Sequence, residues 1–154
     1  MPSEFVRIRL NQQMEDSLRQ FMTRQEFPKG ATLCEQGVPA AGIYLIETGA
    51  VRILLSAGDD KDQLLEVVGA GTLLGLSDSM AGEQYRVTAE AEEPTTATFI
   101  SREAFLDFLS RHQDFCMQVI RLLSENLHGL YHKFRSVNAH PGRPRRRSLN
   151  EGLS

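Results

Sequence analysis

Two cysteines and four histidines are the side chains of this chain whose types could support metal or redox chemistry. His128 and His132 lie four positions apart in a predicted helix, a spacing at which two imidazoles can reach one zinc ion. Both lie outside the apolar seam of that helix, so we interpret them as surface histidines. Cys34 could respond to oxidants, although a small buried or turn cysteine is the commoner role. Cys116 lies on a different predicted element.

The same residue types argue against several kinds of site. An iron–sulfur cluster takes four cysteine ligands, and the chain has two cysteines. No histidine lies between residues 1 and 111, so that region offers no histidine to hold haem or a metal. No nucleophile and base stand out as a catalytic pair. We therefore expect no metal site, no catalytic residues and no enzyme.

Length and composition indicate an ordinary soluble domain. A chain of 154 residues, 41% apolar and 24% charged, can bury one core without staples. No apolar run approaches the roughly 20 residues that cross a bilayer. The N-terminus lacks the basic start and apolar stretch of a secretory signal. With two cysteines on separate elements, we expect no disulfide framework, a cytoplasmic location and no membrane partner.

The charge is unevenly distributed. Residues 139–154 carry a net +3, which leaves −6 for the rest of a chain whose total is −3. An acidic body binds phosphate backbones poorly unless its basic residues cluster. The four arginines between Arg143 and Arg147 could touch phosphates, and Arg145 to Ser148 could be a phosphorylation site. A basic, disordered tail over 138–154 is the interpretation we favour.

The elements that would position any site change period along the chain. Apolar residues predict a short helix over 11–22, which Pro28 and Gly30 separate from the strands. Glycine-punctuated runs then predict strands over 41–46, 50–55, 64–68, 85–91 and 95–100. The turn at Gly49 predicts a hairpin between the first two. Residues 76–83 suit a loop or a single helical turn, and Ser101 is the expected N-cap of a helix over 102–110. A small β-barrel follows.

The last predicted helix, over 113–137, carries apolar residues in alternating steps of four and three. This is the period of a helix that pairs with another helix, although a core helix has a similar repeat. We predict that it forms a dimer interface, with the module ending at residue 137. The predicted interface residues are Cys116, Ile120, Leu123, Leu127, Leu130, Phe134 and Val137.

Three spaced motifs carry a resemblance to a known family. These are the segments 27–37 (FPKGATLCEQG), 43–51 (IYLIETGAV) and 71–75 (GTLLG). In this order, ahead of a long helix, they resemble the cyclic-nucleotide-binding fold of Crp/Fnr transcription regulators over about residues 10–137. The resemblance implies a mainly β fold with flanking helices, a double-stranded β-helix (jelly-roll) barrel followed by a dimerisation helix.

The resemblance also implies a ligand cassette, in which a glutamate accepts from the ribose and an arginine neutralises the phosphate. In this chain the glutamate position is Leu76 and the arginine position is Tyr85, with Arg86 one residue late. A one-residue offset in a strand turns a side chain to the other face. We therefore expect Tyr85 to fill the pocket and Arg86 to face solvent, unless the loop over 81–84 restores the register.

Cyclic nucleotide remains a possible ligand of this pocket, but a pocket plugged by the chain's own side chains is the interpretation we favour. No other cofactor is expected. The resemblance places Tyr131 where the helix meets the partner's pocket. The candidate pocket residues are Gly75, Leu76, Ser77, Asp78, Tyr85, Arg86, Val87, Thr88 and Tyr131.

Two functions remain open at this point. The first is an effector-sensing, homodimeric module of a Crp/Fnr-type transcription regulator with a degenerate pocket. The alternative is an interaction module without a ligand, which forms heterodimers with full-length regulators. The regulators continue into a helix-turn-helix domain of roughly 60 residues, and only 17 residues follow Val137. We therefore expect no DNA-binding domain in this chain.

Overall fold

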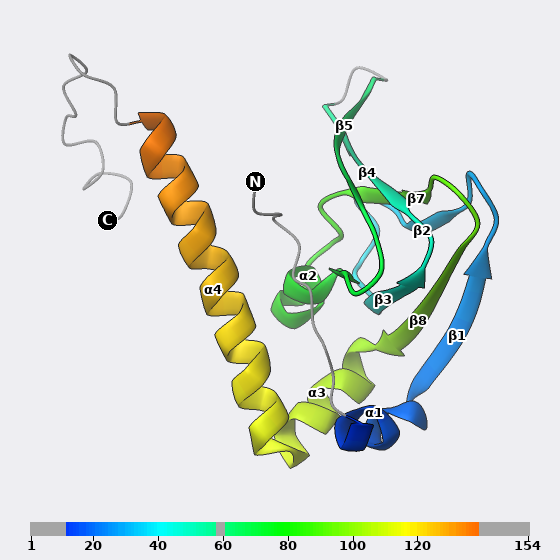
Figure 1. The fold of residues 1–154 in the computed structure, drawn as a ribbon, viewed down its shortest axis with the longest axis vertical. Coiled ribbons are helices and arrows are strands. Elements are labelled where there is room, and N and C mark those ends of the chain that lie inside the picture. Colours follow the sequence, from blue (N-terminus) through cyan, green and yellow to red (C-terminus); the bar gives the residue numbers. More distant parts are fainter. Residues whose placement is uncertain (1–11, 58–60, 139–154) are drawn as a thin grey trace.

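Two antiparallel four-stranded sheets face each other in the computed structural model, which describes residues 12–57 and 61–138 (Figure 1). The first sheet has the strand order β1 (Met22–Phe27), β8 (Thr95–Ser101), β3 (Gly42–Thr48), β6 (Leu73–Leu74). The second has the order β2 (Thr32–Cys34), β7 (Thr88–Ala91), β4 (Val51–Ser56), β5 (Asp62–Val68). This architecture confirms the predicted jelly-roll barrel with flanking helices.

The space between the sheets holds one of two apolar cores. Alternate residues of the strands point into it, because successive side chains of a strand face opposite ways. Ile46, Ile53 and Ala97 are among its fully buried members, and they come from both sheets. Burying a Val, Leu or Ile side chain contributes about 1.5–3 kcal/mol to the stability of the fold. The apolar residues between the sheets therefore hold the two sheets together.

Three helices cover the first sheet and enclose the second core. They are α1 (Gln12–Arg19), α3 (Arg102–Arg111) and α4 (Gln113–Asn138). Leu18 of α1, Ile43 of β3 and Phe108 of α3 are buried together there. The ring of Phe108 meets that of Phe115 edge to face at 5.1 Å, which joins α3 to α4.

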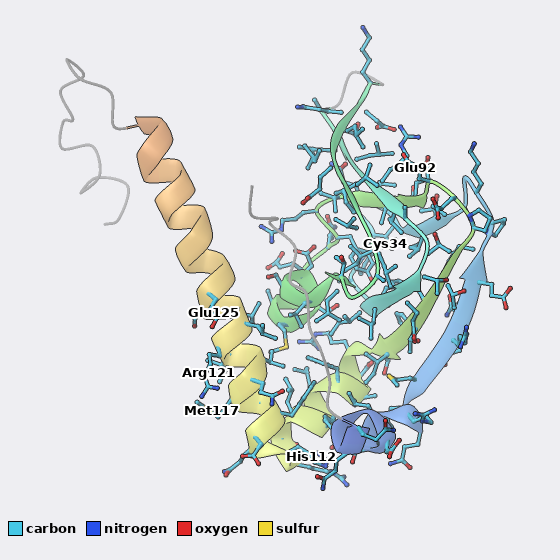
Figure 2. All side chains as sticks on the ribbon, viewed as in Figure 1. Cys34, Glu92, His112, Met117, Arg121 and Glu125 are labelled. Atoms are coloured by element: carbon cyan, nitrogen blue, oxygen red, sulfur yellow. The ribbon has the colours of Figure 1, made fainter. Side chains whose placement is uncertain are left out.

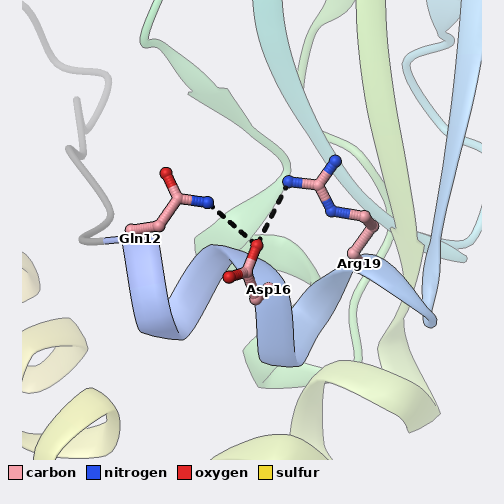
Figure 3. Close-up of polar contacts among 3 residues, drawn as sticks. All are labelled: Gln12, Asp16 and Arg19. Atoms are coloured by element: carbon pink, nitrogen blue, oxygen red, sulfur yellow. Dashed lines mark hydrogen bonds and ion pairs between the residues drawn. The ribbon is translucent and has the colours of Figure 1, made fainter.

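The ends of the helices follow their sequence signals. The Ser101 hydroxyl accepts a hydrogen bond from the Ala104 amide at 3.1 Å, so Ser101 is the N-cap of α3 as predicted. On the polar face of α1, one carboxylate oxygen of Asp16 accepts from the Gln12 amide at 2.9 Å and from Arg19 at 3.4 Å (Figure 3). Among the described residues, no helix is both long enough and apolar enough to span a bilayer.

Three local predictions were wrong. The helix expected over 11–22 ends at Arg19, and Met22 begins β1, because the segment pairs with β8 in register from Met22 opposite Ile100. The hairpin expected at Gly49 is absent from the described fold, since β3 and β4 lie in different sheets. Gly49, with φ of 99°, packs against Pro94 and Thr95 and carries the chain from one sheet to the other.

The third wrong prediction is the strand expected over 85–91. It begins only at Thr88. Its first part pairs elsewhere, because the Tyr85 amide donates to the Val38 carbonyl and the Tyr85 carbonyl accepts from the Gly37 amide, both at 2.9 Å. These two bonds anchor Tyr85 to the turn that follows β2.

The α4 helix starts directly after α3 and rises past the barrel (Figure 1). Its 26 residues correspond to about 39 Å of helix at 1.5 Å per residue. Phe115 and Val119 on its first turns are buried in the second core. Met117, Arg121 and Glu125 lie on the side turned away from the barrel (Figure 2).

Candidate functional site

The candidate site is built around α2 (Leu76–Ala81), the short helix that was expected as a loop or single turn. Glycines in the left-handed region bound it, Gly75 with φ of 83° and Gly82 with φ of 71°. A Cβ on Gly75 would lie 2.7 Å from the Tyr85 ring and 3.0 Å from the Gly42 carbonyl oxygen. Glycine is therefore required here both for the turn and for the close approach of the ring.

Tyr85 fills the position at which the family resemblance expects the phosphate-binding arginine. It is 6% exposed and belongs to the core between the sheets. Its hydroxyl donates to the Gly42 carbonyl at 2.7 Å and accepts from the Gly42 amide at 3.3 Å. Burial raises its pKa to about 12, so the phenol is neutral at physiological pH.

A second hydroxyl meets the same carbonyl. Ser79 of α2 is buried, and its Oγ donates to the Gly42 carbonyl at 2.9 Å. Gly42 is the first residue of β3 and pairs with Ser101 of β8. Two buried hydroxyls therefore fasten α2 and Tyr85 to one point at the start of β3. A hydrogen bond of this kind contributes about 1 kcal/mol.

Arg86 points outward. Its side chain is 75% exposed, whereas that of its partner Asp78 is 13% exposed. The Arg86 Nε donates to Asp78 Oδ1 at 2.8 Å, and its backbone amide donates to Asp78 Oδ2 at 3.1 Å. The carboxylate in the first turn of α2 thus occupies the guanidinium and fixes the loop that leads to Tyr85.

The remaining candidate residues lie in different environments. Leu76, at the glutamate position, is 3% exposed and packs in the second core. Ser77 is exposed. Val87 packs against the core between the sheets. The Thr88 hydroxyl accepts from the Gln36 amide at 3.0 Å. The side chain of Tyr131 lies outside the described residues, so its expected role stays a prediction.

An open cleft of about 740 Å³ lies beside α2 and the Tyr85 loop. Asp78, Glu83 and Arg86 are the charged residues that line it, and Leu55 forms part of its wall. Two carboxylates therefore stand against one guanidinium, which one of them already binds. This balance disfavours an anionic ligand.

Cys34 lies inside the barrel, and burial raises the pKa of its thiol to about 12 (Figure 2). Because the thiolate is the reactive species, a thiol with this pKa is inert near neutral pH. Neither cysteine forms a disulfide, and among the described residues no three His, Cys, Asp or Glu side chains gather as a metal site. The side chains of His128 and His132 lie outside the described part of the chain.

The predicted seam of α4 divides between two environments. Cys116 and Leu123 are partly buried and pack against the second core of their own chain. Ile120 is 49% exposed, and the neighbouring Met117 is 51% exposed. Over its described members, Cys116, Ile120 and Leu123, the seam lies along the border of the face that covers the barrel. The side chains of its remaining members, Leu127, Leu130, Phe134 and Val137, lie outside the described residues.

The sequence reasoning missed three residues that hold the site together: Gly42, Ser79 and Arg102. Gly42 had a weak signal, because a glycine that starts an apolar strand often marks a close backbone approach. Ser79 and Arg102 had none, since a serine in a short polar segment and an arginine in a first helical turn are ordinary surface residues. Their partners are distant in sequence, so only the fold identifies them.

Comparison with known proteins agrees with this architecture. The model of the family described as "Cyclic nucleotide-binding domain" matches residues 24–112, more than half of the chain. A CRP-like cAMP-activated global transcriptional regulator of Mycobacterium tuberculosis (strain CDC 1551 / Oshkosh) is 24% identical over 131 residues, covering 82% of this chain and 58% of that protein. The fumarate and nitrate reduction regulatory protein of Vibrio cholerae is 26% identical over 121 residues, covering 78% and 48%.

The fold has counterparts among solved structures. A cyclic nucleotide-binding domain from Methylobacillus flagellatus superimposes with a TM-score of 0.71 at 20% identity, covering 92% of this chain and 80% of that one. The present chain spans about half the length of the two regulators it matches. The Mycobacterium tuberculosis protein is a transcriptional regulator, and the Vibrio cholerae protein is a regulatory protein. By fold and by family match, the chain belongs to the cyclic nucleotide-binding domain family, with Crp/Fnr-like regulators among its homologues.

Proposed function

We propose that this chain is the sensing and dimerisation domain of a Crp/Fnr-type regulator whose pocket no longer takes cyclic nucleotides. The observation that carries the proposal is Tyr85, whose ring and hydroxyl occupy the place of the phosphate-binding arginine. The hydroxyl bonds to Gly42 at 2.7 Å, so the residue already has a partner and offers no cation. A buried phosphate without a cation loses several kcal/mol of binding free energy.

The second half of the cassette supports the same proposal. A ribose hydroxyl needs a carboxylate acceptor, and Leu76 stands at that position, buried among apolar side chains. Arg86, the nearest cation to the cleft, is held outward by Asp78 at 2.8 Å. For Arg86 to reach the interior, the chain would have to shift by one residue. That shift would expose the Tyr85 ring and break its bonds to Gly42.

Isothermal titration with cyclic AMP and cyclic GMP tests the proposal. We expect no saturable heat for the wild-type domain up to about 1 mM nucleotide, a limit that corresponds to a binding free energy near −4 kcal/mol. The Arg86→Ala variant serves as the matched control. A micromolar affinity that falls in Arg86→Ala would show that Arg86 is the phosphate ligand, and it would overturn the proposal.

We also propose that α4 pairs with the α4 of a second copy. The helix is about 39 Å long, and Phe115 and Val119 of its first turns are buried in the second core. Ile120 is half exposed although it lies in the apolar seam, and the sequence continues the four–three pattern to Val137. A symmetric pair would cover this stripe on both copies.

Sedimentation equilibrium of the wild type and of Ile120→Asp tests the pairing. We expect a dimer for the wild type and at least a tenfold weaker self-association for the variant, because a charge would enter an apolar seam. Arg121→Asp, one residue along and on the side turned away from the barrel, is the control. A wild type that stays monomeric across a 100-fold range of protein concentration would contradict the pairing. Equal effects of the two variants on self-association would also contradict it. Mixed dimers with a full-length regulator would instead favour the heterodimer alternative.

A further inference from the structure

Arg102, the first residue of α3, bonds to the last turn of the cassette helix. Its Nε donates to the Ser79 carbonyl at 2.6 Å. The Ser79 carbonyl lies at the C-terminal end of α2, where it also accepts a hydrogen bond from the Gly82 amide at 3.2 Å. A cation there complements the helix dipole. A Cβ on Gly82, the C-cap of α2, would lie 3.3 Å from the Arg102 guanidinium. Glycine at this position leaves room for the guanidinium.

The backbone of Arg102 is fixed to Ala41, directly before the strand residue Gly42 that holds Tyr85. Its amide donates to the Ala41 carbonyl at 2.9 Å, and Ser101 before it is the partner of Gly42 across the sheet. Among the described residues, Arg102 forms no ion pair with a carboxylate. Its guanidinium therefore has one role that the structure shows, the bond to α2.

The α3 helix continues this connection to α4. Phe105, one turn after Arg102, meets Phe115 of α4 edge to face at 6.0 Å, and Phe108 meets the same ring at 5.1 Å. All three rings are buried, and packed interiors transmit displacements rather than absorb them. A change in the position of α2 can thus reach the first turns of α4 through one side chain and one aromatic cluster.

From these contacts we propose that Arg102 is the positioning residue that couples the cassette helix α2 to the α3–α4 arm. This inference rests on the proposed role of the domain as a sensor, and it adds the route by which the pocket region would act on the dimerisation helix. A ligand or partner that displaced Ser79 or Tyr85 from Gly42 would release α2, and Arg102 would carry the change to α3.

Native-state hydrogen exchange of five proteins forms the test: wild type, Tyr85→Phe, Arg102→Ala, their double variant, and Arg111→Ala. Arg111→Ala removes another arginine of α3, whose exposed side chain forms an ion pair with Asp107 at 3.2 Å and with no other carboxylate among the described residues. We expect Arg102→Ala to raise exchange in α2 about tenfold, as loss of a charge-assisted hydrogen bond predicts, and Arg111→Ala to leave it within twofold. Tyr85→Phe should raise exchange in both α2 and the first turns of α4.

The decisive result is the double variant. With Arg102 absent, we expect Tyr85→Phe to affect α2 alone, so the two substitutions are non-additive at α4. An unchanged effect of Tyr85→Phe on α4, or an unchanged exchange rate in α2 of Arg102→Ala, would overturn the coupling. Arg102→Lys, which keeps the cation, should give intermediate rates and replaces Arg102→Ala if that variant does not fold. Binding of a cyclic nucleotide by the wild type would refute the proposed function. The exchange measurements test the coupling independently, so the two failures can be told apart.

Discussion

The two sides of α2 hold neighbouring residues in opposite ways. On the inner side, neutral hydroxyls of Ser79 and Tyr85 share the Gly42 carbonyl in a buried environment. On the outer side, a charged pair joins Arg86 to Asp78, with the guanidinium largely in water. Water screens the outer pair, and a missing partner on the inner side leaves a buried polar group unsatisfied. We therefore expect the neutral, buried side of α2 to contribute more to the stability of the cassette than the exposed charged pair.

Truncation of Tyr85 and of Arg86 to alanine should show the largest difference between the two sides of α2. Tyr85→Ala should lower the free energy of unfolding by about 3–5 kcal/mol, the range for loss of a buried aromatic ring. Arg86→Ala should lower it by about 0.5 kcal/mol or less, as for exposed ion pairs. Urea unfolding followed by circular dichroism measures both. Equal losses would mean that the outer pair matters as much as the inner bonds.

Alkaline pH provides a second test, because it ionises the buried phenol of Tyr85 and the buried thiol of Cys34. Burial raises the pKa of Tyr85 from 10.0 to about 12 and that of Cys34 from 9.0 to about 12. The folded state therefore binds these protons more tightly than the unfolded state. Their contribution is fully present below pH 9 and is lost as the pH rises toward 12. For Tyr85 the loss is on the order of 2–3 kcal/mol.

Unfolding measured between pH 8 and pH 12 tests this dependence. In Tyr85→Phe the phenol is absent, so the decline above pH 10 should be shallower than in the wild type. A profile identical to that of the wild type would show that Tyr85 does not titrate inside the barrel. Cys34→Ala, measured over the same pH range, shows how much of the loss of stability above pH 9 comes from ionisation of the Cys34 thiol.

Removal of the Tyr85 hydroxyl alone has a smaller expected effect. Tyr85→Phe keeps the ring and its packing but loses the bonds to Gly42. We expect a loss of about 1–2 kcal/mol at pH 7, the value of a buried hydrogen bond together with an unsatisfied partner. Tyr44→Phe is the matched control, since Tyr44 is a partly buried tyrosine that packs against the same core. If both variants lost a similar amount of unfolding free energy, the effect would come from removing any tyrosine hydroxyl and not from the bonds between Tyr85 and Gly42.

The smallest effect concerns charge on the outer side. Arg86→Gln removes the cation and leaves the backbone amide of residue 86 free to donate to Asp78 as before. We expect a change within about 0.5 kcal/mol in low salt and none in 0.5 M salt, because salt screens exposed pairs. Thermal unfolding in both salts measures it. A loss that persists in high salt would indicate a buried role for the guanidinium.

Periodicity and turn chemistry were sufficient to predict the barrel, the long helix and the Ser101 cap. The alternation from residue 85 to 91 also predicted which way Tyr85 and Arg86 face, even though the ladder itself starts at Thr88. It failed where pairing partners are distant. Met22 joined β1 because β8 lies beside it, and the turn at Gly49 joined two sheets instead of two paired strands. Local propensity is weak against such tertiary contacts.

The site divides in the same way. The family resemblance predicted that Leu76 and Tyr85 stand at the cassette positions, and the period of two predicted that Tyr85 and Arg86 face opposite ways. Residue types and short spacings are present in the sequence without any distant partner. The shared carbonyl of Gly42 and the clamp of Arg102 on Ser79 became visible only when segments 23 to 43 residues apart met. Hydrogen bonds are short-range and directional, so no spacing in a single segment encodes them. The amino-acid order determined which groups were available, and tertiary packing decided which of them touch.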